Sequence, residues 1–237
     1  MKRKNIIVLL SLFLVIVFIT ACSNSSEQND AEHEENQTEN SDTSKQADDP
    51  IDLTLTELLP YKKGYVWNYD GAIEYGHEME LQTIEKSNEQ SVYTVEGEVE
   101  DVSGGESGAD YSLHVTYTVT EDSITQDVES DMMMDNVFPQ IELIHAPLAE
   151  GTEWTQTKEN AEGEEVTLES TIEAVENDGD QIIYTVLYED SDSDYYEKRK
   201  IKEGVGVIAF EHLYIYEEDS MPMGYELNYD FTGFPDS

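Results

Sequence analysis

The chain has 237 residues, with 12 Lys and Arg against 54 Asp and Glu, and its formal net charge is −42. Nucleic-acid binding is excluded, because it requires a basic stripe that neutralises phosphates, and electrostatic attraction to an anionic membrane surface is excluded for the same reason. Two interpretations of the acidity stay open: a solvated surface suited to a saline or alkaline habitat, and a surface that captures cations or a cationic partner.

Residues 1–21 have the order of a secretory signal peptide. A basic start at positions 2–4 precedes an apolar run over positions 6–19, and the small residues Thr20 and Ala21 follow. The apolar run is shorter than the roughly 20 residues that a membrane-spanning helix needs. We therefore predict signal cleavage between Ala21 and Cys22.

Cys22 is the only cysteine, so the chain cannot form an intramolecular disulfide. The run Ile19-Thr20-Ala21-Cys22 resembles the lipobox of bacterial lipoproteins. The resemblance implies that the sulfur of Cys22 carries a diacylglyceryl group and that Cys22 begins the mature chain. Two or more acyl chains would hold the protein stably on the outer face of the cytoplasmic membrane. A free or intermolecularly paired thiol is the alternative.

Residues 22–50 are expected to form a disordered acidic tether. From Ser23 to Pro50 the chain has no aromatic and no β-branched aliphatic residue, and it is rich in Ser, Asn, Glu, Gln and Asp. Such a segment cannot bury enough apolar surface to offset the entropy lost on ordering. As a flexible coil it would span roughly 30 Å, enough to hold a folded domain clear of the lipid headgroups.

From residue 51 onward, one pattern occurs twice. The motif P-x-x-x-G-x-x-W predicts a turn that leads into a strand with an inward-facing Trp ring. The segments that we match are residues 60–67 with 147–154, 83–85 with 171–173, and 93–95 with 184–186. The matches predict two related β units, residues 51–146 and 147–237, which form either two units or a single domain over 51–237.

Apolar and polar residues alternate along several stretches, which predicts half-buried antiparallel strands. The predicted strands include residues 111–119, 166–172, 181–188, 206–216 and 225–231. We expect ten to twelve strands and at most two helical turns, near Leu55–Leu59 and Met132–Phe138. The fold class is therefore all-β, with two related antiparallel units that form curved sheets or an open barrel.

These motifs support a family resemblance. The P-x-x-x-G-x-x-W turns, the loop Asp101–Gly108 and the Gly204-Val-Gly206-Val run resemble those of a group of Gram-positive cell-surface lipoproteins of unknown function. The resemblance covers most of the mature chain. It implies no catalytic residues, because the group has no established activity.

The chain contains no complete catalytic motif. The run Gly105–Ala109 ends in Ala where the G-x-S-x-G nucleophile elbow requires Gly, and it lies between predicted strands. His77 begins an incomplete H-E-x-x-H motif, because Leu81 occupies the second His position. His114 and His212 have no Ser, Cys or Asp partner at a recognisable spacing. We therefore predict that the protein is not an enzyme.

Two segments carry metal-ligand chemistry in incomplete form. Asp190, Asp192 and Asp194 resemble the start of a calcium loop, but Tyr195 and Ile201 replace the Gly and Glu of an EF-hand. A carboxylate calcium site of another kind or a polar hairpin turn fits this run. Met132–Met134 could offer thioethers to Cu(I), or form an apolar plug between the units.

The sequence as a whole predicts a lipid-anchored extracytoplasmic lipoprotein that acts as a non-enzymatic binding or structural surface protein. Apart from the lipid on Cys22 and the calcium option, no cofactor is expected. The membrane is reached through the anchor, and a cell-wall partner or a cationic partner is an open option. The alternatives are a carrier of a small apolar ligand and a calcium- or cation-binding surface domain. Fifteen tyrosines fit strand packing, or a groove that stacks sugars.

Overall fold

The computed structural model describes residues 54–216 and 219–235, with side chains at all of these positions except 215 and 216. The predicted signal peptide, its cleavage site at Ala21 and Cys22, and the predicted tether lie outside this part of the chain.

The described chain consists almost entirely of β-strands. A single 3-10 helix, η1 (Leu55–Leu58), comes first. The strands are β1 (Val66–Gly71), β2 (Gly76–Lys86), β3 (Ser91–Val99), β4 (Ser112–Val119), β5 (Ser123–Glu129), β6 (Gln140–His145), β7 (Glu153–Glu159), β8 (Glu165–Asp178), β9 (Gln181–Asp190), β10 (Tyr196–Lys202), β11 (Gly206–Tyr216) and β12 (Asp219–Leu227). No helix within residues 54–216 and 219–235 is long and apolar enough to cross a membrane.

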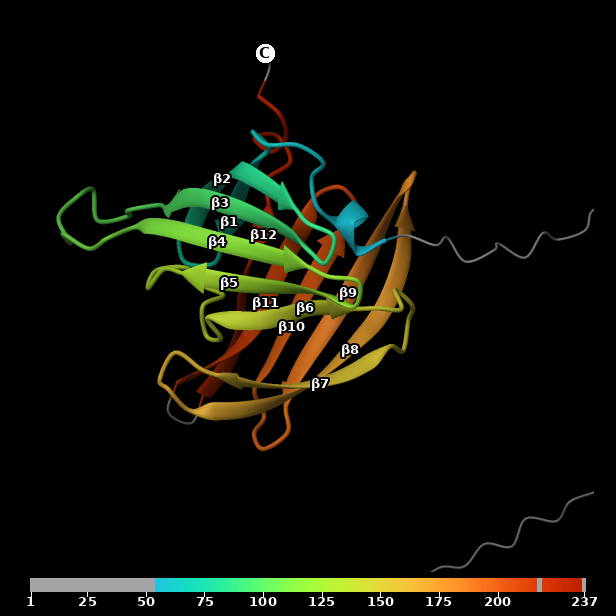
Figure 1. Ribbon diagram of the computed structural model, residues 1–237. Helices are drawn as coiled ribbons and strands as arrows, with labels where there is room; N and C mark the ends of the chain where they lie inside the picture. Colours follow the sequence, from blue (N-terminus) through green and yellow to red (C-terminus); the bar gives the residue numbers. More distant parts are fainter. Residues whose placement is uncertain (1–53, 217–218, 236–237) are drawn as a thin grey trace, which may run out of the picture. The chain divides into compact units, whose positions relative to one another are not determined.

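All twelve strands belong to one antiparallel sheet, which curls into a nearly closed barrel (Figure 1). The spatial order is β6-β5-β4-β3-β2-β1-β12-β11-β10-β9-β8-β7, so each half of the chain forms a six-stranded meander. The halves join where β1 pairs with β12, for example at Tyr69 and Leu227. The all-β prediction is therefore confirmed, and the structure favours one barrel built from two halves over separate curved sheets.

Side chains close the barrel between its two terminal strands, β6 and β7. The Gln156 side chain on β7 accepts a hydrogen bond from the Glu142 backbone N–H (2.8 Å) and donates one to the Glu142 carbonyl (3.0 Å). Further along, Lys158 Nζ donates to Gln140 Oε1 (3.2 Å). One amide side chain thus takes the place of a backbone ladder, and it satisfies groups that a sheet edge would otherwise leave open.

The two copies of the P-x-x-x-G-x-x-W motif have the same local structure. Gly64 and Gly151 have φ values of 82° and 83°, in the left-handed region that favours glycine. The N–H of Gly64 donates to the Leu81 carbonyl (2.7 Å), and the N–H of Gly151 donates to the Ile172 carbonyl (2.8 Å). The motif therefore sets a matching turn at the start of β1 and β7.

The structure corrects one part of the repeat alignment. Leu81 pairs with Val95 and Ile172 pairs with Val186, and each ladder has a register shift directly afterwards. Leu81 therefore corresponds to Ile172, and the match of residues 83–85 with 171–173 is wrong. Because the β7–β8 hairpin is longer than the β1–β2 hairpin, matched positions of the two units are separated by as many residues before the bulge as they are after it. The match of 93–95 with 184–186 agrees with these ladders.

Most predicted elements are present, and two differ. Twelve strands fall within the expected number, β11 has the predicted bounds, and η1 confirms the helical turn near Leu55–Leu59. The helical turn at Met132–Phe138 is wrong, because Ser130 Oγ accepts from the Met132 N–H and Asn136 donates to the Ser130 carbonyl. Such side-chain bonds compete with helical ones. The last strand spans Asp219–Leu227, so the predicted 225–231 contains only its end.

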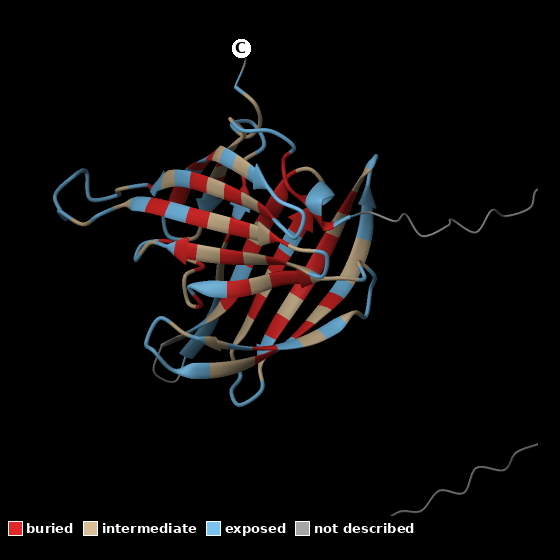
Figure 2. Cartoon of the chain, in the orientation of Figure 1, coloured by how far each residue is buried: buried red, intermediate tan, exposed pale blue. Residues whose placement is uncertain are grey.

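The interior of the barrel is one continuous core. Buried and exposed residues alternate along the strands, as Figure 2 shows. Large aromatic side chains fill much of the interior and bond across it: Trp67 Nε1 donates to the Val205 carbonyl and Tyr69 OH to the Val207 carbonyl, both at 2.7 Å. The buried polar tips of these rings therefore have partners, as buried aromatic residues usually require.

Candidate functional site

Strand β10 carries charge on both of its faces. It contains four of the chain's 12 basic residues, namely Lys198, Arg199, Lys200 and Lys202. Alternation directs Glu197 and Arg199 into the barrel, where both are 0% exposed. Ionised groups are costly to bury unless they are paired and hydrogen-bonded. The surroundings of these two side chains therefore define the most unusual chemistry of the described chain.

Arg199 forms a buried ion-pair network with two carboxylates. Its Nη2 lies 3.0 Å from Glu197 Oε2 and 3.8 Å from Asp135 Oδ2. Asp135 is also 0% exposed. It comes from residues 130–139, the loop between β5 and β6, which we call the inner loop. A segment with no regular secondary structure therefore contributes one of the two counter-ions.

Tyrosine and amide groups hold the two carboxylates in place. Asp135 Oδ2 accepts hydrogen bonds from Tyr225 OH (2.8 Å) and Gln126 Nε2 (3.2 Å). Glu197 Oε1 accepts one from Tyr195 OH (2.8 Å). We refer to Arg199, Glu197 and Asp135 with these three partners as the Arg199 cluster. Its members come from β5, β10, β12, the inner loop and the turn before β10.

The Arg199 cluster has hydrogen-bonding capacity that the protein does not use. Arg199 Nε and Nη1 and Asp135 Oδ1 are buried, and none has a partner among the described protein groups. A guanidinium has five N–H donors, of which Nε and Nη1 supply three. A buried donor or acceptor left without a partner costs about 1–3 kcal/mol. This excess of donors around one cation suits an anionic guest.

Aromatic rings surround the guanidinium. The Cζ atom of Arg199 lies 5.0 Å from the ring centroid of Phe210 and 5.7 Å from that of Tyr188. Such cation–π contacts are worth about 2 kcal/mol or more when the cation is desolvated. The rings therefore stabilise the charge of Arg199 while leaving several of its N–H groups open.

Burial and mutual attraction set the protonation states of the cluster. Burial lowers the pKa of Arg199, but the Glu197 and Asp135 carboxylates outweigh this effect and raise that pKa overall. Burial raises the pKa of Glu197, against the opposing pull of Arg199 and the Tyr195 hydrogen bond. Arg199 therefore stays protonated at neutral pH.

Two histidines line the same interior. His77 is 1% exposed, its ring stacks on Tyr69 with centroids 4.4 Å apart, and neither ring nitrogen has a hydrogen-bond partner among the described groups. Burial lowers the pKa of His77 to about 4, although Asp135 opposes the shift. Burial also lowers the pKa of His212, which stacks on Phe210. Both rings are therefore neutral at pH 7.

This arrangement can hold a charge, but it does not resemble a catalytic constellation. A nucleophilic site needs a base within hydrogen-bonding reach of the nucleophile and a third group that orients the base. His77 has no such contact in the described chain. The two carboxylates bond to tyrosines, Gln126 and Arg199, so the cluster holds opposite charges together inside the barrel.

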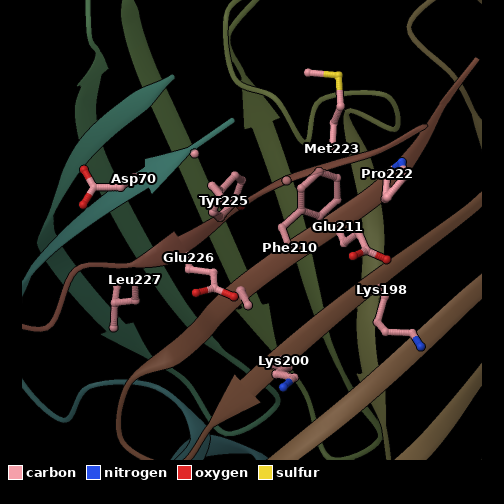
Figure 3. A pocket seen from close by; sticks show the side chains of 13 residues that line it. Asp70, Lys198, Lys200, Phe210, Glu211, Pro222, Met223, Tyr225, Glu226 and Leu227 are labelled. Carbon is pink, nitrogen blue, oxygen red and sulfur yellow. The ribbon is translucent and has the colours of Figure 1, made fainter. Parts of the chain in front are cut away.

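The outer face of the same strands forms an open groove of about 640 Å³. Figure 3 shows the residues around it, with Lys198 and Lys200 on β10 and Asp70 on β1. Two of its charged groups already have partners: Lys198 Nζ lies 2.8 Å from Glu173 Oε2, and the Asp70 carboxylate accepts from the Asn228 amide at 2.7 Å. The groove is therefore a weaker candidate for ligand capture than the Arg199 cluster.

Of the aspartates of the predicted calcium loop, Asp190 is the half-buried last residue of β9, and Asp192 and Asp194 lie in the exposed turn between β9 and β10. The Asp190 carboxylate accepts hydrogen bonds from the Asp192 N–H (3.0 Å) and from Ser193 Oγ (2.6 Å), as in a polar turn. Among residues 54–216 and 219–235, no group of three or more His, Cys, Asp or Glu could hold a metal ion. A calcium site at Asp190, Asp192 and Asp194 remains a prediction from the sequence alone.

The other candidates from the sequence lie apart from the cluster. Ser107 is exposed in the β3–β4 loop and bonds Tyr111 OH (2.7 Å), and His114 is exposed on the outer face of β4. Met132 is exposed, whereas Met133 is buried in the inner loop. Met133 thus fills the barrel interior next to Asp135, consistent with an apolar plug.

Sequence reasoning missed Arg199, Glu197 and Asp135. The run Tyr196–Lys202 has charged residues on both faces, so alternation alone gives no reason to place either face inside. One signal was available in the sequence: four of the few basic residues of a very acidic chain lie close together, within residues 196–202. The contribution of Asp135 depends on the course of a loop, which no periodicity predicts.

No family model and no curated protein matches the chain. Two solved structures are similar to it. One is a candidate lipoprotein from Parabacteroides distasonis ATCC 8503, at 12% identity and a TM-score of 0.41, over 75% of this chain and 100% of the other. The second is a candidate exported protein with YmcC-like fold from Bacteroides fragilis NCTC 9343, at 10% identity and a TM-score of 0.41, over 71% and 96%. Likenesses this weak carry no functional argument.

Proposed function

We propose that the protein is a lipid-anchored surface lipoprotein of the Gram-positive type, held on the outer face of the cytoplasmic membrane, with a non-enzymatic binding barrel. The observation that carries the anchor is Ile19-Thr20-Ala21-Cys22, which resembles a lipobox and contains the only cysteine of the chain. A lone exported thiol is otherwise prone to oxidation, and lipidation accounts for it. Acylation supplies stable attachment without a spanning helix.

The test of the anchor is fractionation of cells that express the full chain. Wild-type protein is expected in the membrane fraction, resistant to high salt and released by detergent. The Cys22→Ala protein is expected to lose this tight attachment, because diacylglyceryl transfer requires the sulfur. Ser25→Ala, three residues further on, is the matched control and is expected to remain membrane-bound. A Cys22→Ala protein that stays tightly bound overturns the proposal.

The binding role rests on the interior of the barrel. The three unpartnered N–H donors of Arg199 and the open Oδ1 of Asp135 are groups that a ligand could satisfy. Their burial among aromatic rings matches the usual make-up of ligand sites, in which a few polar groups lie in an apolar lining. Carriage of a small ligand with an apolar body is therefore the second candidate function.

The acidic outer face supports a cationic partner. Glu78 lies directly opposite Glu98, and Glu80 opposite Glu96, across the β2–β3 ladder. Like charges in such positions destabilise a sheet, and a bound cation would relieve the repulsion. These residues line an open groove of about 840 Å³.

A polyamine tests this partner class. We expect spermine to raise the thermal midpoint of the wild type more than sodium chloride at equal ionic strength does, because specific binding stabilises beyond general screening. The Glu80→Gln/Glu96→Gln variant should lose that difference. Equal stabilisation by spermine and matched salt contradicts a cationic partner at this face.

A further inference from the structure

The inner loop places a carboxylate and two apolar side chains inside the barrel. Met133, Asp135 and Phe138 are 3%, 0% and 2% exposed. They lie on a segment of turns and bends between β5 and β6. Buried interiors of β-barrels are usually filled from the strands, since alternate residues face inward. Here a loop fills part of the interior with one anionic and two apolar groups.

Asp135 is an imperfect partner for Arg199. The 3.8 Å between Arg199 Nη2 and Asp135 Oδ2 exceeds hydrogen-bonding distance, whereas Glu197 lies at 3.0 Å. Asp135 Oδ1 and Arg199 Nη1 are both buried without a protein partner. The loop therefore supplies a second carboxylate near Arg199, but it leaves charge-assisted hydrogen bonds unmade. Such bonds are about twice as strong as neutral ones.

Apart from the two hydrogen bonds that Asp135 accepts from Tyr225 and Gln126, few hydrogen bonds hold the inner loop. Asn136 donates to the carbonyl of Ser130, and the Asn136 N–H donates to the Met133 carbonyl at 3.3 Å, so both bonds stay within the loop. Its backbone bonds to other elements include the Met134 N–H to Tyr75 OH (3.1 Å) and the Ala161 N–H to the Val137 carbonyl (2.8 Å). Residues 131–138 could leave the interior without breaking a strand ladder, whereas Pro139 stays joined to β5 because its carbonyl accepts from the Val128 N–H (2.7 Å).

We propose that the Arg199 cluster is a binding site for an amphiphile with one anionic head group, carboxylate or phosphate, and that the inner loop is a built-in occupant which this ligand displaces. Asp135 stands for the head group, and Met133 and Phe138 stand for the apolar body. The ligand head pairs with Arg199 between Phe210 and Tyr188, and its body takes the volume that the loop side chains now fill. This inference deepens the binding role proposed above and is independent of the lipid anchor.

The proposal predicts the effect of weakening the built-in occupant. When only a fraction of the protein is binding-competent, the apparent affinity equals the intrinsic affinity multiplied by that fraction. Asp135→Asn removes the loop's charge and makes displacement easier, so anionic amphiphiles should bind about tenfold tighter or more. Asp131→Asn is the matched control, since Asp131 is exposed on the same loop. Arg199→Lys keeps the charge but loses two of the five N–H donors and the planar fork of the guanidinium, and should weaken binding by about tenfold.

The test uses the mature chain from residue 22, with Cys22→Ser to prevent oxidation. Decanoate, decyl phosphate and uncharged decanol are titrated by calorimetry into the wild type and the three variants, and hydrogen exchange of residues 130–139 is followed with and without ligand. We expect one or both anions to bind, tighter in Asp135→Asn and weaker in Arg199→Lys, with decanol about tenfold weaker or more. Exchange in the loop should rise on binding.

The carboxylate and phosphate arms distinguish fatty acids from lipid phosphates as the source of the head group. Absence of binding in both the wild type and Asp135→Asn overturns the proposal, as does equal affinity for decanol. Equal affinities of Asp135→Asn and Asp131→Asn also overturn it, even if Arg199→Lys fails to fold. These outcomes leave the fractionation result for Cys22→Ala untouched, so failure of the ligand and failure of the anchor are separate.

Discussion

Replacing Arg199 with Met tests the buried ion-pair network most severely. Met occupies a similar volume but carries no charge, so Glu197 and Asp135 would remain as carboxylates without a cation. Both are 0% exposed, and solvent cannot screen them. Removal of one partner from a buried ion pair costs about 3–5 kcal/mol. We expect a loss of this size in the free energy of unfolding at pH 7, measured by urea denaturation with tryptophan fluorescence.

The neighbouring residue supplies the matched control. Lys198 Nζ lies 2.8 Å from Glu173 Oε2, but the two side chains are 34% and 47% exposed. Exposed pairs contribute about 1 kcal/mol at most, so Lys198→Met should have a small effect. Adding Glu197→Gln and Asp135→Asn to Arg199→Met removes the uncompensated charges and should recover most of the loss. An Arg199→Met effect no larger than that of Lys198→Met refutes the account of the buried network.

Three further predictions concern the interior and the closure of the barrel. Burial lowers the pKa of His77 from 6.5 in the unfolded chain to about 4 in the folded protein. The folded state therefore resists protonation of this ring, and the free energy of unfolding should fall by about 3 kcal/mol in total as the pH drops from 6.5 toward 4. His77→Phe should lack this component in urea titrations between about pH 7 and about pH 4, and an unchanged slope contradicts it. Gln156→Ala should lower the free energy of unfolding by about 1–3 kcal/mol and speed amide exchange at Glu142, because it removes two hydrogen bonds across the β6–β7 closure. If the Glu142 amide stays protected from exchange in this variant, the barrel is not closed by the Gln156 side chain. Trp67→Phe should lower the free energy of unfolding in urea by about 1–3 kcal/mol more than Trp154→Phe does. The reason is that the Trp67 N–H donates to the Val205 carbonyl, whereas the Trp154 N–H is buried without a partner. Equal costs of the two substitutions would count against this reading.

The β architecture could be predicted from the sequence because it depends on local patterns. Alternation over residues 111–119 and 206–216 follows from the two-residue period of a strand, and both segments form strands close to the predicted bounds. The P-x-x-x-G-x-x-W repeat marks matching turns because only glycine adopts the left-handed conformation at Gly64 and Gly151 without strain. Local rules of this kind also predicted η1.

The candidate site could not be predicted, because it depends on contacts between distant parts of the chain. Asp135 reaches Tyr225, which is 90 residues away in sequence, through the path of the inner loop. Glu197 and Arg199 lie on a strand whose two faces are both charged, so hydrophobic periodicity does not say which face is buried. The closure by Gln156 likewise depends on the curl of the whole sheet.

The central claim is that this barrel is anchored by a lipid on Cys22. The most direct test is mass spectrometry of the intact protein extracted from membranes, together with fragmentation of its N-terminal peptide. The account predicts a chain that begins at Cys22 and carries at least a diacylglyceryl group on the sulfur. A chain that still begins at Met1, or one with an unmodified Cys22, would contradict it.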